Sequence, residues 1–437
     1  MSALFSFLIV HMLYFKVNIK LVILILAIME LGINIKKKKK EFLTLFLSFG
    51  ILLSAFNNVL VISSFDFALT SSRAKSIKAR VISDSSVGKY QNTLNVEVLE
   101  ATCDKGNTYS AKGTMRVNCS NIKAYTNDII QFYGKVTPYG FNAKSYKILE
   151  QSTISKRRAT CIKYLDAKIK GITDKERQLS KLLLLGIKEQ DNYPLKELSQ
   201  KSGSAFVLAL SGMHLSFLAL LIKRLLFFTG KRNSKIISML LITFYVIVVG
   251  SKASLLRALL LSYCFTIFKK DKNTTLLATL LLHIALFPCT VSTLASAYSY
   301  LALCGIFSLS DYIKNALNKI IYLPPFLSSS ISASLAALLY TSHLSYLTFG
   351  TYQISIVLTA GAISAITFIY MSIAIFAIFF PFLLEINHYC YIALEKLMTI
   401  GAKAPQCTSL LPLLILFILI TILLIWKKEM KNFLLSK

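Results

Sequence analysis

Polar residues interrupt an apolar stretch that begins at Gly203. Ser211, Gly212 and His214 lie near its middle. Ser211 and His214 are three residues apart, so a helix places them on one face. Gly212 has no side chain, so another backbone or a ligand can approach it closely. These residues either form a helix–helix contact or line a water-filled path, because polar groups at membrane depth usually face such a cavity.

Arg257 lies about one turn inside another apolar segment, after a loop that contains Ser251, Lys252 and Ser254. An unpaired arginine at membrane depth costs at least ~2.5 kcal/mol. Its side chain either extends outward to water or pairs with a carboxylate or a phosphate, to which a guanidinium donates two parallel hydrogen bonds. The loop residues add further donors for an anion.

A third polar interruption is the run Tyr298, Ser299 and Tyr300, again inside an apolar segment. Ser299 is typical of a contact between membrane helices. The two tyrosine rings either stack on nucleic-acid bases or simply pack against other helices.

The composition sets the class of protein that must position these residues. Of 437 residues, 55% are hydrophobic and 16% are charged. A soluble chain carries a higher share of charge. Several apolar runs approach the ~20 residues that a helix needs to cross a bilayer. The sequence therefore predicts a polytopic α-helical membrane protein with a small extracytoplasmic β-domain.

Apolar runs and basic loops predict the membrane spans and their orientation. The candidate spans are 205–222, 235–250, 253–268, 274–288, 291–309, 327–347, 352–380 (one tilted or two short spans) and 409–426. Lys and Arg gather after the first, third, fifth and last of these spans. Cytoplasmic loops are rich in these residues, so we expect the C-terminus inside.

Residues 1–69 form the predicted N-terminal transmembrane region. Five consecutive lysines, 36–40, should stay in the cytoplasm, and the apolar run 42–65 then crosses outward. The segment after this crossing should therefore lie outside the cytoplasm.

In residues 70–155, apolar and polar residues alternate with a period of two, which is typical of half-buried strands. The strand-like segments are 76–83, 93–102, 108–117 and 129–136, with turn signals between them. We expect a periplasmic β-domain of four to six strands. The pattern is compatible with an OB-like barrel but does not by itself choose that fold.

Cys103 and Cys119 both follow predicted strands of this domain. In an oxidising compartment two such thiols pair, and closing this loop adds roughly 3 kcal/mol in the chain-entropy model. We therefore predict a Cys103–Cys119 disulfide. The sequence contains no cluster of Cys and His residues, so it predicts no metal site.

Residues 156–202 are predicted as basic amphipathic helices that lie at the membrane interface. They form either a lipid-anchored belt or a basic rim that guides an anion. The whole chain has 49 Lys and Arg against 20 Asp and Glu, a net charge of +29. Part of this excess of positive charge is explained by basic cytoplasmic loops, which set the orientation of membrane proteins. The remainder indicates a polyanionic partner.

Four segments resemble the signature blocks of the ComEC-type competence family. They are Leu183–Gly186, Ala209–His214, Ser254–Ala258 and Tyr298–Ile306, and their order and spacing match over roughly 180–310. The resemblance implies a multi-pass protein of the bacterial inner membrane that imports single-stranded DNA during natural transformation. It also implies that 203–437 is the channel domain and that 70–155 is the oligonucleotide-binding domain.

The resemblance assigns the polar interruptions to the DNA path. The candidate residues are Gly203, Ser211, Gly212, His214, Ser251, Lys252, Ser254, Arg257, Tyr298, Ser299 and Tyr300.

The expected partners are single-stranded DNA, the lipid bilayer and several proteins. Longer members carry a metallo-β-lactamase-like domain, but this sequence has no His-x-His-x-Asp-His motif. It also has no Gly-x-x-x-x-Gly-Lys-[Ser/Thr] loop for a nucleotide. We therefore expect no catalytic residues, no metal and no cofactor here, and instead a periplasmic DNA-binding protein, a separate nuclease and a cytoplasmic helicase.

Two rival functions remain open. One is a membrane-embedded enzyme for a lipid-linked or polyanionic substrate, although no second acid or base is placed beside His214. The other is a small-solute transporter, although the sequence shows no internal repeat.

Overall fold

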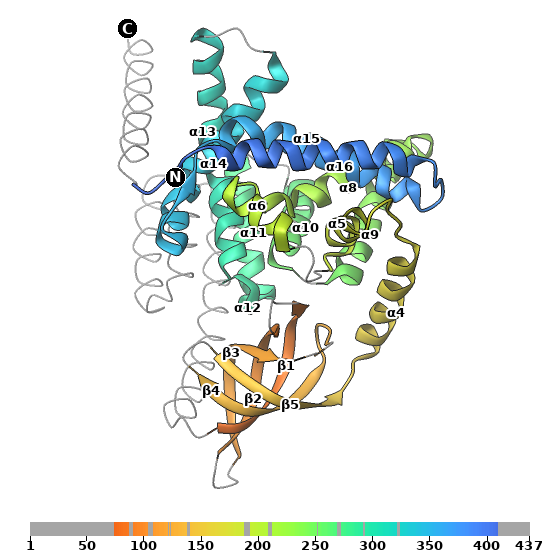
Figure 1. Cartoon of the computed structure of the whole chain (residues 1–437), viewed down its shortest axis with the longest axis vertical. Coiled ribbons are helices and arrows are strands. Elements are labelled where there is room, and N and C mark those ends of the chain that lie inside the picture. The colour runs from red at the N-terminus through yellow and green to blue at the C-terminus, as the bar shows by residue number, and fades with distance from the viewer. Residues whose placement is uncertain are drawn as a thin grey trace.

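The computed structural model describes residues 74–86, 91–103, 108–120, 122, 124–137, 140–187, 193–208, 212–250, 252–268, 272–291, 293–320 and 324–409. A β-barrel comes first along this part of the chain, and a helical part follows it (Figure 1). The predicted spans in 1–69 and 409–426 lie almost wholly outside the described residues.

Five strands close the barrel. They are β1 (Ala74–Ser86), β2 (Asn92–Cys103), β3 (Thr108–Cys119), β4 (Ile129–Thr137) and β5 (Gly140–Glu150). Their order is β1-β2-β3-β5-β4, and β1 pairs with β4 to close the ring. Every pair is antiparallel except β3 with β5. This arrangement is consistent with the OB-like barrel. The strand β5 had no counterpart among the four strand-like segments expected from the sequence.

Alternating side chains explain why these segments form a barrel. In β2, Leu94, Val96 and Val98 are at most 1% exposed, whereas Asn95 between them faces outward. Successive side chains of a strand point to opposite faces. The period-two pattern therefore sends one apolar row of each strand into a common core.

The predicted Cys103–Cys119 disulfide is wrong. Cys103 ends β2 and Cys119 ends β3, and the antiparallel register places Cys119 opposite Asn92 at the start of β2. At ~3.3 Å per residue along a strand, the two cysteines are separated by more than about 30 Å. A disulfide needs Cα atoms within about 7 Å, and both thiols are free. Burial raises the pKa of the Cys119 thiol.

The helical part contains fourteen helices within the described residues. They are α4 (Thr153–Lys168), α5 (Asp174–Leu185), α6 (Tyr193–Lys201), α7 (Ala205–Leu208), α8 (Gly212–Leu225), η2 (Phe227–Thr229), α9 (Lys231–Val249), α10 (Ala253–Phe268), α11 (Lys272–Leu286), α12 (Pro288–Val291), α13 (Leu294–Ile320), α14 (Pro325–Phe349), α15 (Ile356–Ala377) and α16 (Leu383–Lys403). A short pair, β6 (Tyr352–Gln353) and β7 (Gln406–Cys407), follows α14 and α16.

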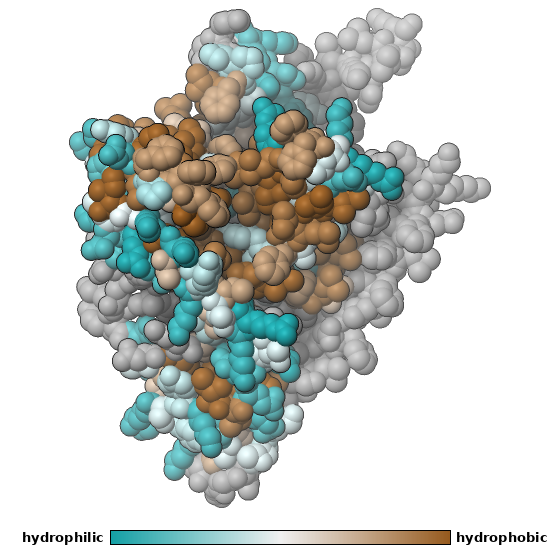
Figure 2. All heavy atoms as spheres, turned by 90° about the vertical axis from the view of Figure 1, so that its right-hand side faces the viewer, coloured by the Kyte–Doolittle hydropathy of each residue, from teal (hydrophilic) through white to brown (hydrophobic). Residues whose placement is uncertain are grey.

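Two of the described helices, α9 and α15, are long and apolar enough to cross a membrane by length and composition. Residues 253–266 and 275–286 form shorter apolar helices. Hydrophobic side chains form a broad area over the helical part, whereas hydrophilic ones are more frequent over the barrel (Figure 2). The α13–α14 hairpin stands along the long axis, and α15 and α16 lie across it (Figure 1).

The predicted spans correspond to helices with two differences. The span 205–222 is divided between α7 and α8, on either side of 209–211, which lie outside the described residues. The helix α16 had no predicted counterpart, because Glu385, His388 and Glu395 lower its hydropathy.

The helix α5 corrects the prediction for 156–202. The preceding helix α4 does keep an exposed basic face, but α5 is buried, and Leu179 and Leu183 are 0% exposed. They pack in one cluster with residues of α15 and α16. Four consecutive leucines, 182–185, make the last turn of α5 apolar on every side, and a helical surface of this kind is buried.

Arg158 connects the barrel to a candidate membrane helix. Its Nε donates to the Val248 carbonyl at 2.5 Å, and its Nη2 donates to the Val249 carbonyl at 2.7 Å. These two residues end α9, whose last carbonyls have no partner within the helix. The guanidinium also lies 5.6 Å from the ring centre of Tyr125, between β3 and β4.

Replacing Arg158 by Ala should destabilise the full chain. Two buried carbonyls would lose charged donors, and such bonds contribute about 1.5–3 kcal/mol each. The thermal midpoint of the protein in detergent should fall by several degrees. The neighbouring Arg157→Ala, at an exposed position, is the matched control. Equal midpoints for the two variants would contradict the assignment.

Candidate functional site

A buried polar cluster lies where α8, α10, α11 and α13 meet. It contains Gly212 on α8, Arg257 on α10, His283 on α11, and Ser299 and Tyr300 on α13. Arg257 is 7% exposed, and His283 and Tyr300 are 0% exposed. We call this set the Arg257 cluster.

The guanidinium of Arg257 has few partners. Its Nη1 donates to the Ser299 carbonyl at 3.3 Å, and its Nε is buried without a hydrogen bond. Among the described residues, no carboxylate forms an ion pair with Arg257. The low exposure also means that the side chain does not extend to the surface. The donors of this cation are therefore largely unused.

Gly212 permits the close packing of α8 on α10. A Cβ atom at this position would lie 2.2 Å from Nη2 of Arg257 and 2.9 Å from Cβ of Ala258. Neither distance is compatible with van der Waals contact, so any larger residue would displace the guanidinium. The close approach expected at Gly212 is made by these two α10 side chains.

His283 anchors the other side of the cluster. Its Nδ1 lies 3.1 Å from Oη of Tyr300, and its Nε2 lies 2.9 Å from Oγ1 of Thr290. Because Thr290 donates its own hydroxyl proton to the Phe287 carbonyl, its oxygen accepts from His283 Nε2–H. Nδ1 of the neutral ring then accepts from the Tyr300 hydroxyl.

Neither His283 nor Thr290 was among the site residues predicted from the sequence, although Tyr300 was. The available signal was a histidine in the middle of an apolar run, 274–288. Intramembrane histidines usually face other helices or a cavity. Its contact with Tyr300, however, joins two helices whose relative placement the sequence does not give.

The other predicted path residues lie at different contacts. Tyr298 hydrogen-bonds Ser345 at 3.0 Å and Thr348 at 3.2 Å, so it faces α14. The ammonium of Lys252 donates to the Gly186 carbonyl at 3.1 Å, at the end of α5.

Gly203 turns between α6 and α7 with φ +74°, in the left-handed region that favours glycine. His214 on α8 is 1% exposed, and Ser254 is half-buried at the start of α10. Ser211 and Ser251 lie outside the described residues. The structure therefore brings together Gly212, Arg257, Ser299 and Tyr300 from the predicted set.

A second buried polar group joins α5 to α16. Glu176 is 1% exposed, and its Oε1 lies 2.6 Å from Nδ1 of His388 and accepts from Thr173 Oγ1 at 2.9 Å. Thr173 in turn accepts from the Glu176 amide, which makes a reciprocal N-terminal cap. The Thr-x-x-Glu pattern before an apolar run was the sequence signal for it. This group holds helices together.

Within the described residues, no group of three His, Cys, Asp or Glu side chains could hold a metal ion. The chemistry that the Arg257 cluster can offer is anion binding, through a buried cation whose donors are largely unused.

A model of the family described as "Competence protein" matches residues 183–430, which include the whole Arg257 cluster and exclude the barrel. No curated protein and no solved structure matches the chain.

Replacing Gly212 by Ala should destabilise the protein, because the added Cβ atom would clash with the guanidinium of Arg257. The double variant with Arg257→Ala should then lose less stability than the sum of the single variants. Contacting pairs typically show couplings of about 1 kcal/mol. Thermal midpoints of the four full-length proteins in detergent measure this coupling, and additive effects would show that the two residues do not interact.

Proposed function

The chain belongs to the competence protein family, and we propose that it forms the path by which single-stranded DNA crosses the bacterial inner membrane during natural transformation. Family membership gives it a role in DNA uptake and associates it with the membrane. The conducting role, the inner membrane and a multi-pass topology are parts of the proposal. Residues 203–437 would supply the path.

The observation that carries the proposal is the buried cation of Arg257. Removing a charge from water costs several kcal/mol unless a partner compensates it. Here the described residues offer one carbonyl at 3.3 Å and no carboxylate. A phosphodiester would supply the missing acceptor, because its oxygens accept two parallel hydrogen bonds from a guanidinium.

A closed path accounts for the burial of this cluster. With Arg257 at 7% exposure, a strand passes only after α8 and α10 separate. The two helices approach each other at Gly212, where the missing side chain leaves room for the guanidinium. Lipid cannot solvate a strand that carries one charge per nucleotide, so the opened seam has to hold water and donors.

The barrel would bind the incoming strand outside the membrane. On the β1–β2 face, Lys78 and Arg80 are paired with Glu100 and Glu97. On the β4–β5 face, exposed cations have no such carboxylate among the described residues, and two exposed tyrosines lie on the barrel surface. These residues are Lys135, Lys144 and Lys147, with Tyr109 at 38% and Tyr133 at 40% exposure. Cations neutralise phosphates, and tyrosine rings stack on bases without sequence preference.

The partners complete the proposal. A periplasmic DNA-binding protein would deliver the duplex, a separate nuclease would degrade one strand, and a cytoplasmic helicase would pull the other. The proposal assigns no catalytic step and no cofactor to this chain. Both ring nitrogens of His283 contact neutral groups that join helices, which favours the channel over a membrane-embedded enzyme.

Replacing Arg257 by Ala should reduce the arrival of labelled DNA in the cytoplasm by about tenfold or more, because a charged hydrogen bond contributes about 1.5–3 kcal/mol. Passage of DNA into the periplasm should not change. Arg257→Lys should keep part of the activity, because it keeps the charge. Arg232→Ala, at an exposed cation of α9, is the control. Normal import by a membrane-inserted Arg257→Ala protein would refute the assigned role.

Removing Lys144 and Lys147 together, each by substitution with Gln, should weaken binding of a single-stranded oligonucleotide to the full chain. The slope of log affinity against log salt should become shallower by about 1.4, since each phosphate contact on a single strand contributes about 0.7. The matched variant replaces Lys78 and Arg80, whose charges are already paired. Fluorescence anisotropy measures both, and equal slopes would place the DNA elsewhere on the barrel.

A further inference from the structure

A buried carboxylate and a half-buried histidine form a contact between α5 and α16. Oε1 of Glu176 lies 2.6 Å from Nδ1 of His388. Oε1 also accepts from the Thr173 hydroxyl at 2.9 Å, and Oε2 accepts from the Ile172 amide at 3.2 Å. An amide can only donate, so both carboxylate oxygens act as acceptors, which fits an ionised Glu176. We call this contact the Glu176–His388 pair.

Within the part of the chain that the structure describes, Glu176 has no ion pair with a lysine or an arginine. Its side chain is only 1% exposed, and a carboxylate removed from water costs free energy unless a positive charge compensates it. The buried lysine of the same helix, Lys181, pairs instead with Asp166 at 2.8 Å. The buried Arg158 binds the last carbonyls of α9.

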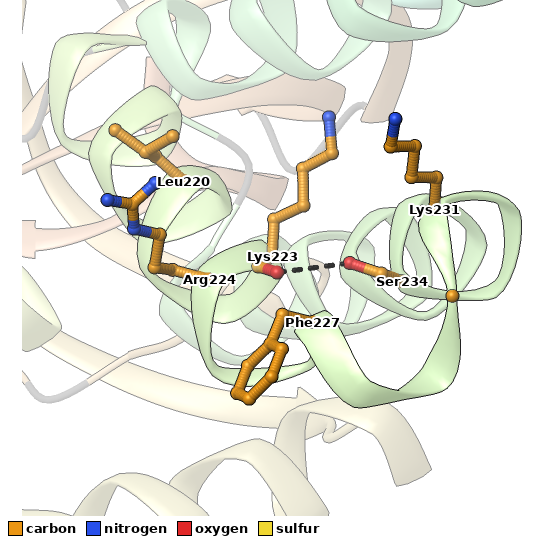
Figure 3. Close-up of a pocket in the computed structure, with 7 residues that line it drawn as sticks. Leu220, Lys223, Arg224, Phe227, Lys231 and Ser234 are labelled. Atoms are coloured by element: carbon orange, nitrogen blue, oxygen red, sulfur yellow. Dashed lines mark hydrogen bonds between the residues drawn. The ribbon is translucent and has the colours of Figure 1, made fainter.

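Other cations of the helical part are exposed to solvent. Lys223, Arg224 and Lys231 line a pocket of about 330 Å³ between the end of α8 and the start of α9 (Figure 3). All three residues are exposed, and in Figure 3 the Lys223 and Lys231 side chains extend in the same direction. Water solvates these charges, whereas the carboxylate of Glu176 is shielded from it. Compensation for that carboxylate therefore has to come from His388.

The charge of His388 decides whether Glu176 has a counter-ion. A neutral imidazole with its proton on Nδ1 donates to the carboxylate, and the pair then carries one negative charge. Uptake of one proton from water at Nε2 converts the ring to an imidazolium and makes the pair neutral overall. The His388 side chain is 34% exposed, so water reaches the ring. An imidazole makes this change between about pH 5 and 8, and a charged donor forms the stronger hydrogen bond with a carboxylate.

The tyrosines that pack around the pair keep their protons near neutral pH. On α15, the Tyr370 hydroxyl donates to the backbone carbonyl of Glu176 at 2.8 Å. On α16, burial and the carboxylates of Glu395 and Glu176 raise the pKa of Tyr391 to about 12. In the described part of the chain, the printed ion pair of His388 is with Glu176. The exposed titratable neighbours along α5 and α16, which water solvates, are Asp174, Lys175, Arg177, Glu385 and Tyr389.

We propose that the Glu176–His388 pair is a proton-binding site that sets how firmly α16 is held against α5. With the imidazole charged, the buried carboxylate has its counter-ion and the contact is strong. As pH rises and His388 loses this proton, one negative charge remains buried and the contact weakens. The stabilisation is therefore present on the acid side of the imidazole transition and lost on the alkaline side. It does not depend on the DNA path.

The position of α5 gives this contact a wider effect. At the other end of α5, the Leu184 carbonyl accepts from the Tyr245 hydroxyl at 2.7 Å, and the Gly186 carbonyl accepts from the ammonium of Lys252 at 3.1 Å. Tyr245 belongs to α9, and Lys252 directly precedes α10. The helix α5 thus joins α16 to α9 and α10, and protonation of the pair changes how firmly one end of α5 is held.

The test compares the unaltered full chain with His388→Gln, Glu176→Gln and the double variant, all in neutral detergent. Glutamine keeps a hydrogen-bonding group at each position but carries no charge. Thermal midpoints are measured from about pH 5.5 to about pH 8.5, which covers the imidazole transition. Hydrogen exchange with mass spectrometry follows the amides of α16, corrected for the intrinsic effect of pH on exchange. The control is His343→Gln, which removes a half-buried imidazole of α14.

At about pH 5.5, His388→Gln should melt a few degrees below the unaltered chain, and this difference should shrink by more than half at about pH 8.5. In the Glu176→Gln background, replacing His388 should have little effect at any pH, because no buried charge remains to be compensated. Protection of the α16 amides in the unaltered chain should fall about fivefold over the same range, the size of a typical coupling between contacting residues. His343→Gln should leave that pH dependence unchanged.

Several results would overturn the proposal. Parallel pH curves for the unaltered chain and His388→Gln would mean that the pair binds no proton in this range. A pH-dependent effect of His388→Gln that persisted without the Glu176 carboxylate would assign the interaction to another group. If Glu176→Gln does not accumulate, hydrogen exchange of the unaltered chain and His388→Gln decides alone, and equal pH dependence of α16 in both would refute the proton-binding site. None of these measurements involves DNA, so the proposed function fails or stands separately.

Discussion

The structure of the helical part depends on the burial of one guanidinium among apolar helices. Arg257 is surrounded by α8, α10 and α13, and the described residues give it a carbonyl at 3.3 Å but no counter-charge. A cation in such a place is retained at a cost in stability. The neighbouring contacts accommodate it: Gly212 leaves room for the guanidinium, and the Ser299 carbonyl accepts one of its hydrogen bonds. A membrane protein that handles a polyanion has a use for this arrangement.

Other basic residues serve the ends of helices. Arg158 binds the last carbonyls of α9, and Lys252 binds the carbonyl of Gly186 after α5. The Tyr245 hydroxyl donates to the Leu184 carbonyl of the same helix end at 2.7 Å. Terminal carbonyls lack partners within their own helix, and inside a bundle water does not replace them. Part of the large positive charge of this chain is therefore structural, and only the remaining cations are available for phosphates.

The available cations of the barrel differ between its two faces. On the β4–β5 face, Lys135, Lys144 and Lys147 are exposed together with Tyr133, a combination that suits single-stranded nucleic acid. On the β1–β2 face, Lys78 and Arg80 are instead paired with Glu100 and Glu97. Among the described residues of these two faces, the β4–β5 face is therefore the one that leaves positive charge for phosphates.

The sequence by itself determined the features that repeat locally. The alternation around Leu94 gave the strands of the barrel, the apolar runs gave most of the helices, and the positions of Gly212 and Arg257 within such runs marked them for close packing and for charge. Only the tertiary structure decided the contacts between distant segments. It placed Cys103 and Cys119 at opposite ends of a hairpin, buried α5 under α15 and α16, and joined His283 to Tyr300. Periodicity records which face of an element is apolar, but the partner of that face, and of each buried polar atom, depends on how the elements cross in space.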